Sequence, residues 1–97
     1  MAMVQSGKFA GRKLHEIKLN EEFADAVLNG EKRFEVRSND RGYQKGDLIQ
    51  FEVIRSNGLR SFHELNDDIR FEITYVLSGW GIKDGYVVFG IRRVDND

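Results

Sequence analysis

The sequence predicts an α+β domain built on a small, partly closed mixed β-barrel of about five strands, with one short helix after the first strand. Two patterns lead to this expectation. Five segments alternate apolar and polar residues with the period of a strand, and one early segment has the start and stop residues of a helix. Ten glycines and no proline occur in the chain, so glycine, asparagine and aspartate must make the turns.

The chain is long enough for one domain. A length of 97 residues, of which 40% are hydrophobic, allows a single modest core. We expect this domain to cover residues 12–95. Residues 1–11 are small, polar and aperiodic, and we expect them to form a flexible lead, either native or an added tag.

Each expected strand has an apolar face that alternates with a polar face. The strands are expected at residues 14–19, 33–38, 48–54, 69–78 and 86–94. In the first four strands the apolar faces comprise His15, Ile17 and Leu19; Phe34 and Val36; Ile49, Phe51 and Val53; and Ile69, Phe71, Ile73, Tyr75 and Leu77. We expect these side chains to form the core, with His15 as a satisfied core histidine and not a catalytic one.

The helix is expected between the first two strands, over residues 20–30. Asn20 is a favourable N-cap, and the two glutamates that follow it suit the positive end of the helix dipole. Phe23, Ala26 and Val27 form a stripe that would face the core. Gly30 fits the left-handed position at which helices end.

Composition excludes several classes of function. The net charge is −1 and there is no cysteine, so a nucleic-acid site must be a local basic patch, and disulfide or thiolate chemistry is excluded. Two histidines do not favour a metal site, and we expect no metal and no other cofactor. We find no apolar run long enough for a signal peptide or a membrane span, so we expect a cytoplasmic location and no membrane contact. We also expect the protein to be a monomer.

The stretch GEKRFEVR, residues 30–37, carries the strongest functional signal. Five of its eight residues are charged, which strand alternation alone does not explain. Basic groups at this density can neutralise phosphates, and Glu35 can fix the direction of Lys32 or Arg37. The alternative is a solvated strand face, which the spacing alone favours.

The motif identifies a resemblance to a known family. Its positions fit the pattern G-x-K-x-x-E-x-R at Gly30, Lys32, Glu35 and Arg37. Through this pattern, the KGD turn at 45–47 and the ending GIKDGYVVFGI at 81–91, residues 13–94 resemble ASCH domains of the PUA-like superfamily, in particular a small ASCH-like family of bacteria and phages. The resemblance implies a pseudo-barrel with a cleft beside the motif that binds RNA or a nucleotide-like molecule.

We expect charged and aromatic side chains from the motif and the nearby loops to line this cleft. The candidate binding residues are Lys32, Arg33, Glu35, Arg37, Arg41, Tyr43, Trp80 and Lys83. Arg41 and Lys83 would extend the basic rim. Trp80 and Tyr43 would stack on bases, and the alternative for both is packing against the core.

Some ASCH relatives are small amidohydrolases that act on a modified cytidine with a lysine, a threonine three residues later and a distant glutamate. Lys32 matches the lysine, but Glu35 stands at the threonine position, and a carboxylate does not replace the hydroxyl nucleophile. An enzyme would have to use Lys32 with Glu35 or Glu72 as the base. We favour a binding domain over this hydrolase, and the third hypothesis is a protein-interaction module with a vestigial cleft.

Overall fold

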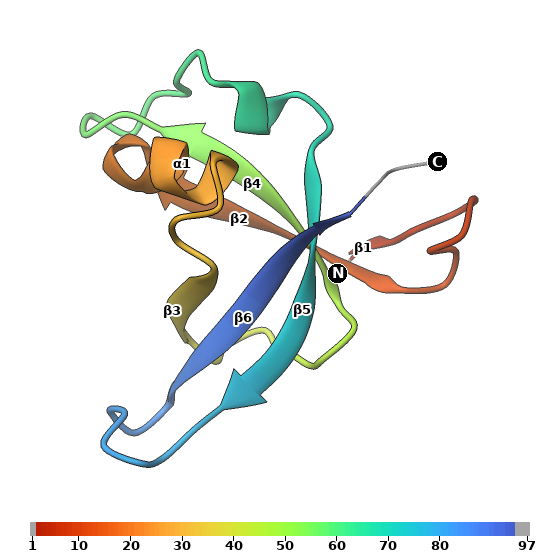
Figure 1. Cartoon of the computed structure of the whole chain (residues 1–97), viewed down its shortest axis with the longest axis vertical. Helices are drawn as coiled ribbons and strands as arrows, with labels where there is room; N and C mark the ends of the chain where they lie inside the picture. Colours follow the sequence, from red (N-terminus) through yellow and green to blue (C-terminus); the bar gives the residue numbers. More distant parts are fainter. Residues whose placement is uncertain (1, 95–97) are drawn as a thin grey trace.

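The computed structural model describes residues 2–94 and contains one six-stranded mixed sheet and one α-helix (Figure 1). Its elements are β1 (Ala2–Met3), β2 (Lys13–Asn20), α1 (Glu21–Leu28), β3 (Phe34–Ser38), β4 (Leu48–Ile54), the 3-10 helix η1 (Glu64–Asn66), β5 (Arg70–Leu77) and β6 (Tyr86–Val94). The predicted α+β class and the helix after the first long strand are confirmed. The predicted domain end at residue 95 lies outside the described residues, and the flexibility of residues 1–11 stays a prediction.

The sheet is open, so the predicted barrel does not close. Its strand order is β1-β2-β4-β5-β6-β3. β2 and β4 are parallel, and the other neighbouring strands are antiparallel. Strand β1 is additional to the five predicted strands and pairs only with Lys13 and Leu14 of β2. Among residues 2–94, the rest of that edge of β2 and the outer edge of β3 have no strand beside them.

Helix α1 lies beside β2 and β4 (Figure 1) and is bounded as the sequence predicts. The side chain of Asn20 accepts a hydrogen bond from the backbone of Glu22 at 3.4 Å, and Gly30 has a φ of +83°. The buried face, however, consists of Ala24 and Val27. Phe23, predicted in the core, is 42% exposed, because it lies on the side of this short helix that faces β3 and the end of β2.

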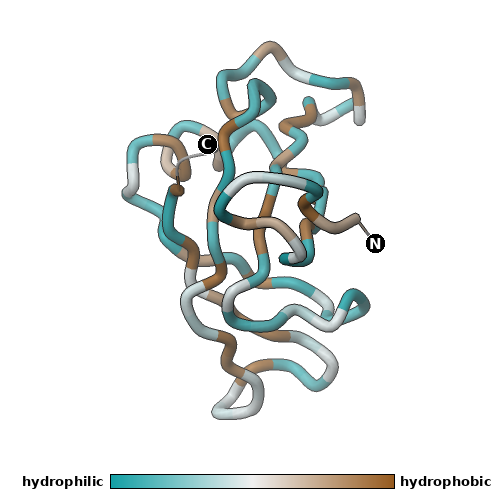
Figure 2. The backbone as a smooth tube through the Cα atoms, turned by 90° about the vertical axis from the view of Figure 1, so that its right-hand side faces the viewer, coloured by the Kyte–Doolittle hydropathy of each residue, from teal (hydrophilic) through white to brown (hydrophobic). Residues whose placement is uncertain are grey.

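The core lies between α1, η1 and the inner face of the sheet. Its largest fully buried side chains are Phe51, Phe89, Leu48, Ile49, Leu65, Ile73, His15, Val27 and Val53. The strand alternation that predicts most of them appears in Figure 2 as hydrophobic and hydrophilic stretches following each other along the tube. His15 is a satisfied core histidine, as expected, because its Nε2 lies 2.8 Å from Oδ2 of Asp47.

The second half of β5 departs from the predicted alternation. β5 and β6 change register between Ile73 and Tyr75, and this bulge shifts the inward face by one residue. Val76 therefore packs against the core, whereas Tyr75 is 64% exposed and Leu77 is 37% exposed. The prediction that both of these side chains enter the core is wrong.

Within residues 2–94, no helix has the length and apolarity that a membrane crossing requires.

Candidate functional site

The curved sheet leaves a gap between β2 and β3, which do not pair, and two arginine side chains cross this gap. Arg37 donates from Nη2 to the carbonyl oxygen of Lys18 at 2.8 Å. Arg41, in the loop after β3, donates from Nη1 to the carbonyl oxygen of Glu16 at 2.9 Å. Residue numbers rise along β3 as they fall along β2, so the two edges face each other in antiparallel directions. Side chains, in place of a backbone ladder, connect this side of the domain.

Strand β3 turns the opposite face to the core from the one that the sequence predicts. Glu35 is 2% exposed, whereas Phe34 is 48% exposed and Val36 is 54% exposed. The prediction that Phe34 and Val36 enter the core is therefore wrong. The buried carboxylate is tolerated because cations neutralise it, and the apolar side chains stay accessible because β3 borders the gap.

Glu35 orients two cations of the motif. Nζ of Lys32 contacts Oε2 of Glu35, and it also donates to the carbonyl oxygen of Phe34 at 2.8 Å. Arg37 donates to Oε1 of Glu35 from Nη2 at 2.7 Å and from Nε at 3.0 Å. Such charge-assisted bonds are strong and directional. The structure therefore assembles the Lys32, Glu35 and Arg37 set that the motif predicts, with Glu35 as the buried organiser.

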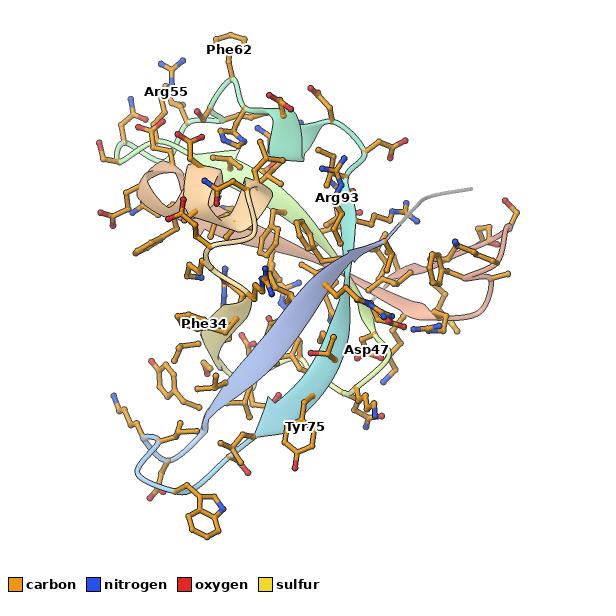
Figure 3. All side chains as sticks on the ribbon, in the orientation of Figure 1. Phe34, Asp47, Arg55, Phe62, Tyr75 and Arg93 are labelled. Carbon is orange, nitrogen blue, oxygen red and sulfur yellow. The ribbon has the colours of Figure 1, made fainter. Side chains whose placement is uncertain are left out.

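A cleft of about 520 Å³ opens where the gap between β2 and β3 meets α1, and we name it the helix-side cleft. It is lined by Lys18, Leu19, Asn20, Phe23, Lys32, Phe34, Glu35, Val36 and Arg37. Nζ of Lys32 lies 5.5 Å from the ring centre of Phe23 and 5.0 Å from that of Phe34, within cation–π range. Figure 3 shows Phe34 at the start of β3. Sequence reasoning missed Phe23, Phe34 and Val36 as site residues, because their apolarity favours the core.

The other end of the gap forms a cleft of about 530 Å³, the loop-side cleft. Its lining includes Arg41 and Tyr43 and carries three cations and three carboxylates. Tyr43 is 5% exposed, and its ring packs 4.8 Å from His15 and 4.7 Å from Phe89 between ring centres. Burial raises the pKa of its hydroxyl. Tyr43 is thus a packing residue, and its ring is not open for a base to stack on.

Two predicted ligand residues, Trp80 and Lys83, lie in the loop of residues 79–85. The backbone N–H of Asn39 donates to a carbonyl oxygen of this loop at 2.8 Å. The loop therefore adjoins the far end of β3, roughly 17 Å along the strand from Phe34. Trp80 is 91% exposed, which rules out its role as a core cap, and neither residue lines the helix-side cleft.

Glu72, the distant carboxylate of the hydrolase hypothesis, is engaged elsewhere. Its two oxygens accept hydrogen bonds from Arg12 and Arg92. The hydrogen bond from Arg12 is the main cause that lowers the pKa of Glu72 below its ordinary value of 4.5. A carboxylate held in this way is a weaker base, and Glu72 does not line the helix-side cleft with Lys32 and Glu35. The described part of the chain contains no group of three His, Cys, Asp or Glu placed to hold a metal.

Comparisons with known proteins give a family and one phage relative. Residues 14–91 match the model of a family described as a domain of unknown function, DUF3850. Over 37 residues the chain is 49% identical to an uncharacterized 12.9 kDa protein in the GpA 3′ region of Escherichia phage P2. That match covers 38% of this chain and 34% of the phage protein. Neither description names a ligand or an activity, and the resemblance to ASCH domains stays a prediction.

Proposed function

The chain belongs to the DUF3850 family, by its match over residues 14–91, and for this member we propose an RNA- or nucleotide-binding function at the helix-side cleft. One observation carries the proposal. The exposed apolar side chains of Phe34 and Val36 flank the two cations, Lys32 and Arg37, that a buried Glu35 holds in place. The ASCH-like pattern of the motif points to the same class of ligand.

The base would lie against the apolar part of the cleft. A single exposed apolar side chain needs no explanation. Here three of them, Phe23, Phe34 and Val36, line one cleft with exposures of 42%, 48% and 54%. Stacking a base on an aromatic ring contributes about 1–3 kcal/mol and tolerates any base. This part of the cleft therefore supplies affinity without sequence preference.

The phosphate would meet the two cations of the motif. Arg37 uses Nε and Nη2 on Glu35 and on the carbonyl oxygen of Lys18, which leaves Nη1 for a ligand. The ammonium of Lys32 lies within 5.5 Å of the ring centres of both Phe23 and Phe34, beside the surface that would hold the base. Because protein contacts already fix both cations, a phosphate would bind them without the cost of ordering them.

Calorimetric titration of short single-stranded RNA and of nucleoside monophosphates into the wild-type protein and Phe34→Ala tests this proposal. We expect Phe34→Ala to weaken binding about fivefold or more, or about 1 kcal/mol. Phe62→Ala is the matched control, because Phe62 is 96% exposed and lies on the loop of residues 55–63, away from β3 (Figure 3). The control should bind like the wild type. Equal losses in the two variants, or no binding by the wild type, would refute the proposal.

A further inference from the structure

The balance of positive and negative side chains differs among three clefts of the domain. Three cations and three carboxylates line the loop-side cleft, and three cations and one carboxylate line the helix-side cleft. A third cleft, of about 410 Å³, is lined by four cations and no carboxylate. The cations are Lys32, Arg33, Arg92 and Arg93, and we name this cleft the arginine groove. In a chain of net charge −1, this concentration of positive charge is local.

The arginine groove meets the helix-side cleft at Lys32, which lines both. The turn after α1 produces this arrangement. Gly30 follows the helix with a φ of +83°, and the chain then places Lys32 and Arg33 in succession just before β3. A ligand that leaves the helix-side cleft past Lys32 therefore enters a surface of arginines.

Several donors in the groove are open to a ligand. The side chain of Arg93 is exposed near the end of β6 (Figure 3) and has no hydrogen bond or ion pair with another described residue. Arg33 uses only Nε, which donates to the carbonyl oxygen of Gly30 at 2.7 Å, so its terminal amino groups remain. Arg92 is paired with Glu72 and contributes less. The groove thus offers two guanidinium groups, and guanidinium suits the geometry of phosphate.

The hydroxyl of Thr74 adds a neutral donor to the same groove. Thr74 lines the groove, and its Oγ1 lies 2.5 Å from the position that a Cβ on Gly90 would occupy. The missing side chain at Gly90 therefore lets the hydroxyl lie against β6, between the motif and the two arginines at the end of that strand. A hydroxyl beside arginines is a common setting for a phosphate oxygen.

We propose that the arginine groove binds the phosphate of the nucleotide next to the one in the helix-side cleft. The ligand class is then a single-stranded oligonucleotide, and a free nucleotide fills only half of the site. This inference rests on the proposed function of the helix-side cleft and adds a second subsite to it. Basic grooves that follow the backbone beside aromatic stacking surfaces are how proteins bind single strands without sequence preference.

The test compares Arg93→Ala with Arg55→Ala. Arg55 lies near Phe62 in the distant loop, and its substitution removes the same charge (Figure 3). Each variant is titrated with a nucleoside monophosphate, with inorganic phosphate, and with short RNA and DNA oligonucleotides at several salt concentrations. We expect Arg93→Ala to bind the oligonucleotides about five- to tenfold more weakly than the wild type and to bind the monophosphate equally well. Its salt slope should fall by about 0.7, the value for one lost phosphate contact on a single strand.

Arg93→Lys keeps the charge and should recover part of the affinity. All variants at this position should melt like the wild type, because the side chain of Arg93 has no hydrogen bond or ion pair with another described residue. If the oligonucleotide binds no tighter than the monophosphate, or if Arg55→Ala loses as much as Arg93→Ala, the second subsite is refuted while the proposed function stands. If Arg93→Ala weakens binding but Phe34→Ala does not, both the second subsite and the proposed function fail. Both also fail if the protein binds inorganic phosphate but neither the monophosphate nor the oligonucleotides.

Discussion

Arg37 donates a hydrogen bond from Nη2 to the carbonyl oxygen of Lys18 at 2.8 Å, across the open side of the sheet. The same guanidinium group holds the buried carboxylate of Glu35. One side chain therefore connects β3 to β2 and also orients the charged motif. The structural role of Arg37 predicts a loss of stability on substitution, and its proposed ligand-binding role predicts a loss of affinity.

Removing Arg37 should destabilise the domain more than neutralising Glu35. Arg37→Met leaves the carboxylate of Glu35, whose side chain is 3% exposed, with Lys32 as its remaining cation. In Glu35→Gln, both cations can turn to water, because their side chains are 19% and 24% exposed. We expect a loss of about 2–4 kcal/mol for Arg37→Met and about 1–2 kcal/mol for Glu35→Gln in urea unfolding. The reverse order would show that the cluster is not organised around a buried anion.

Phe34→Ala should leave the stability of the fold nearly unchanged. Phe34 is 48% exposed, so its truncation removes little buried surface, and we expect a cost under about 1 kcal/mol. Phe51→Ala is the comparison, because Phe51 is 1% exposed and its truncation should cost about 3–5 kcal/mol. Denaturant unfolding of both variants measures this difference. A cost for Phe34→Ala close to that for Phe51→Ala would mean that Phe34 is a core residue.

Acid should weaken the fold partly through Glu72. The hydrogen bonds from Arg12 and Arg92 lower the pKa of Glu72 in the folded protein below its ordinary value of 4.5. The unfolded chain therefore binds more protons between these two pKa values, and this stabilisation is present above about pH 4.5 and lost as the pH falls through the folded pKa. In Glu72→Gln, melting temperatures measured from pH 7 downward should fall less steeply below pH 4.5 than in the wild type. An unchanged acid dependence would contradict the pairing.

Arg37→Ala should weaken RNA or nucleotide binding at least about tenfold, or roughly 1.4 kcal/mol. Lys45→Ala, in the exposed loop, should change binding slightly and mainly through its salt dependence. Arg37→Lys should recover little, since an ammonium keeps the charge but loses the fork that engages Glu35 and Lys18. Each variant is titrated at a temperature at which its melting curve shows it folded. Equal losses in Arg37→Ala and Lys45→Ala would assign the affinity to general surface charge.

The sequence predicts the elements whose signals are local. Asn20 and Gly30 bound the helix through capping chemistry that needs no tertiary contact. The alternation of Phe71 and Ile73 is also local and holds, but the bulge before Tyr75 depends on how β5 pairs with β6. The alternation within one strand does not indicate how that strand pairs with a distant one, so it could not predict the exposure of Tyr75.

The face of β3 shows the same limit at the candidate site. In Phe34, Glu35, Val36 and Arg37, apolar and charged residues alternate, and the usual preference for apolar residues in the core gives the wrong face. The outcome is decided by Lys32 and Arg37, which neutralise Glu35, and by the unpaired edge of β3, which leaves Phe34 accessible. The signal that could have found it was present, because a glutamate with basic residues three positions before and two after can be buried as a paired anion.

Chemical-shift mapping of the isotope-labelled protein with short single-stranded RNAs and a panel of nucleosides tests the central claim most directly. We predict that the largest backbone amide shifts fall on residues that line the helix-side cleft, namely Lys32 and residues 34–37, Leu19 and Asn20 of β2, and Phe23 of α1. Smaller shifts should follow at the end of β6 when the probe is an oligonucleotide. The largest shifts in residues 79–85 instead, or no shifts with any probe, would contradict the account.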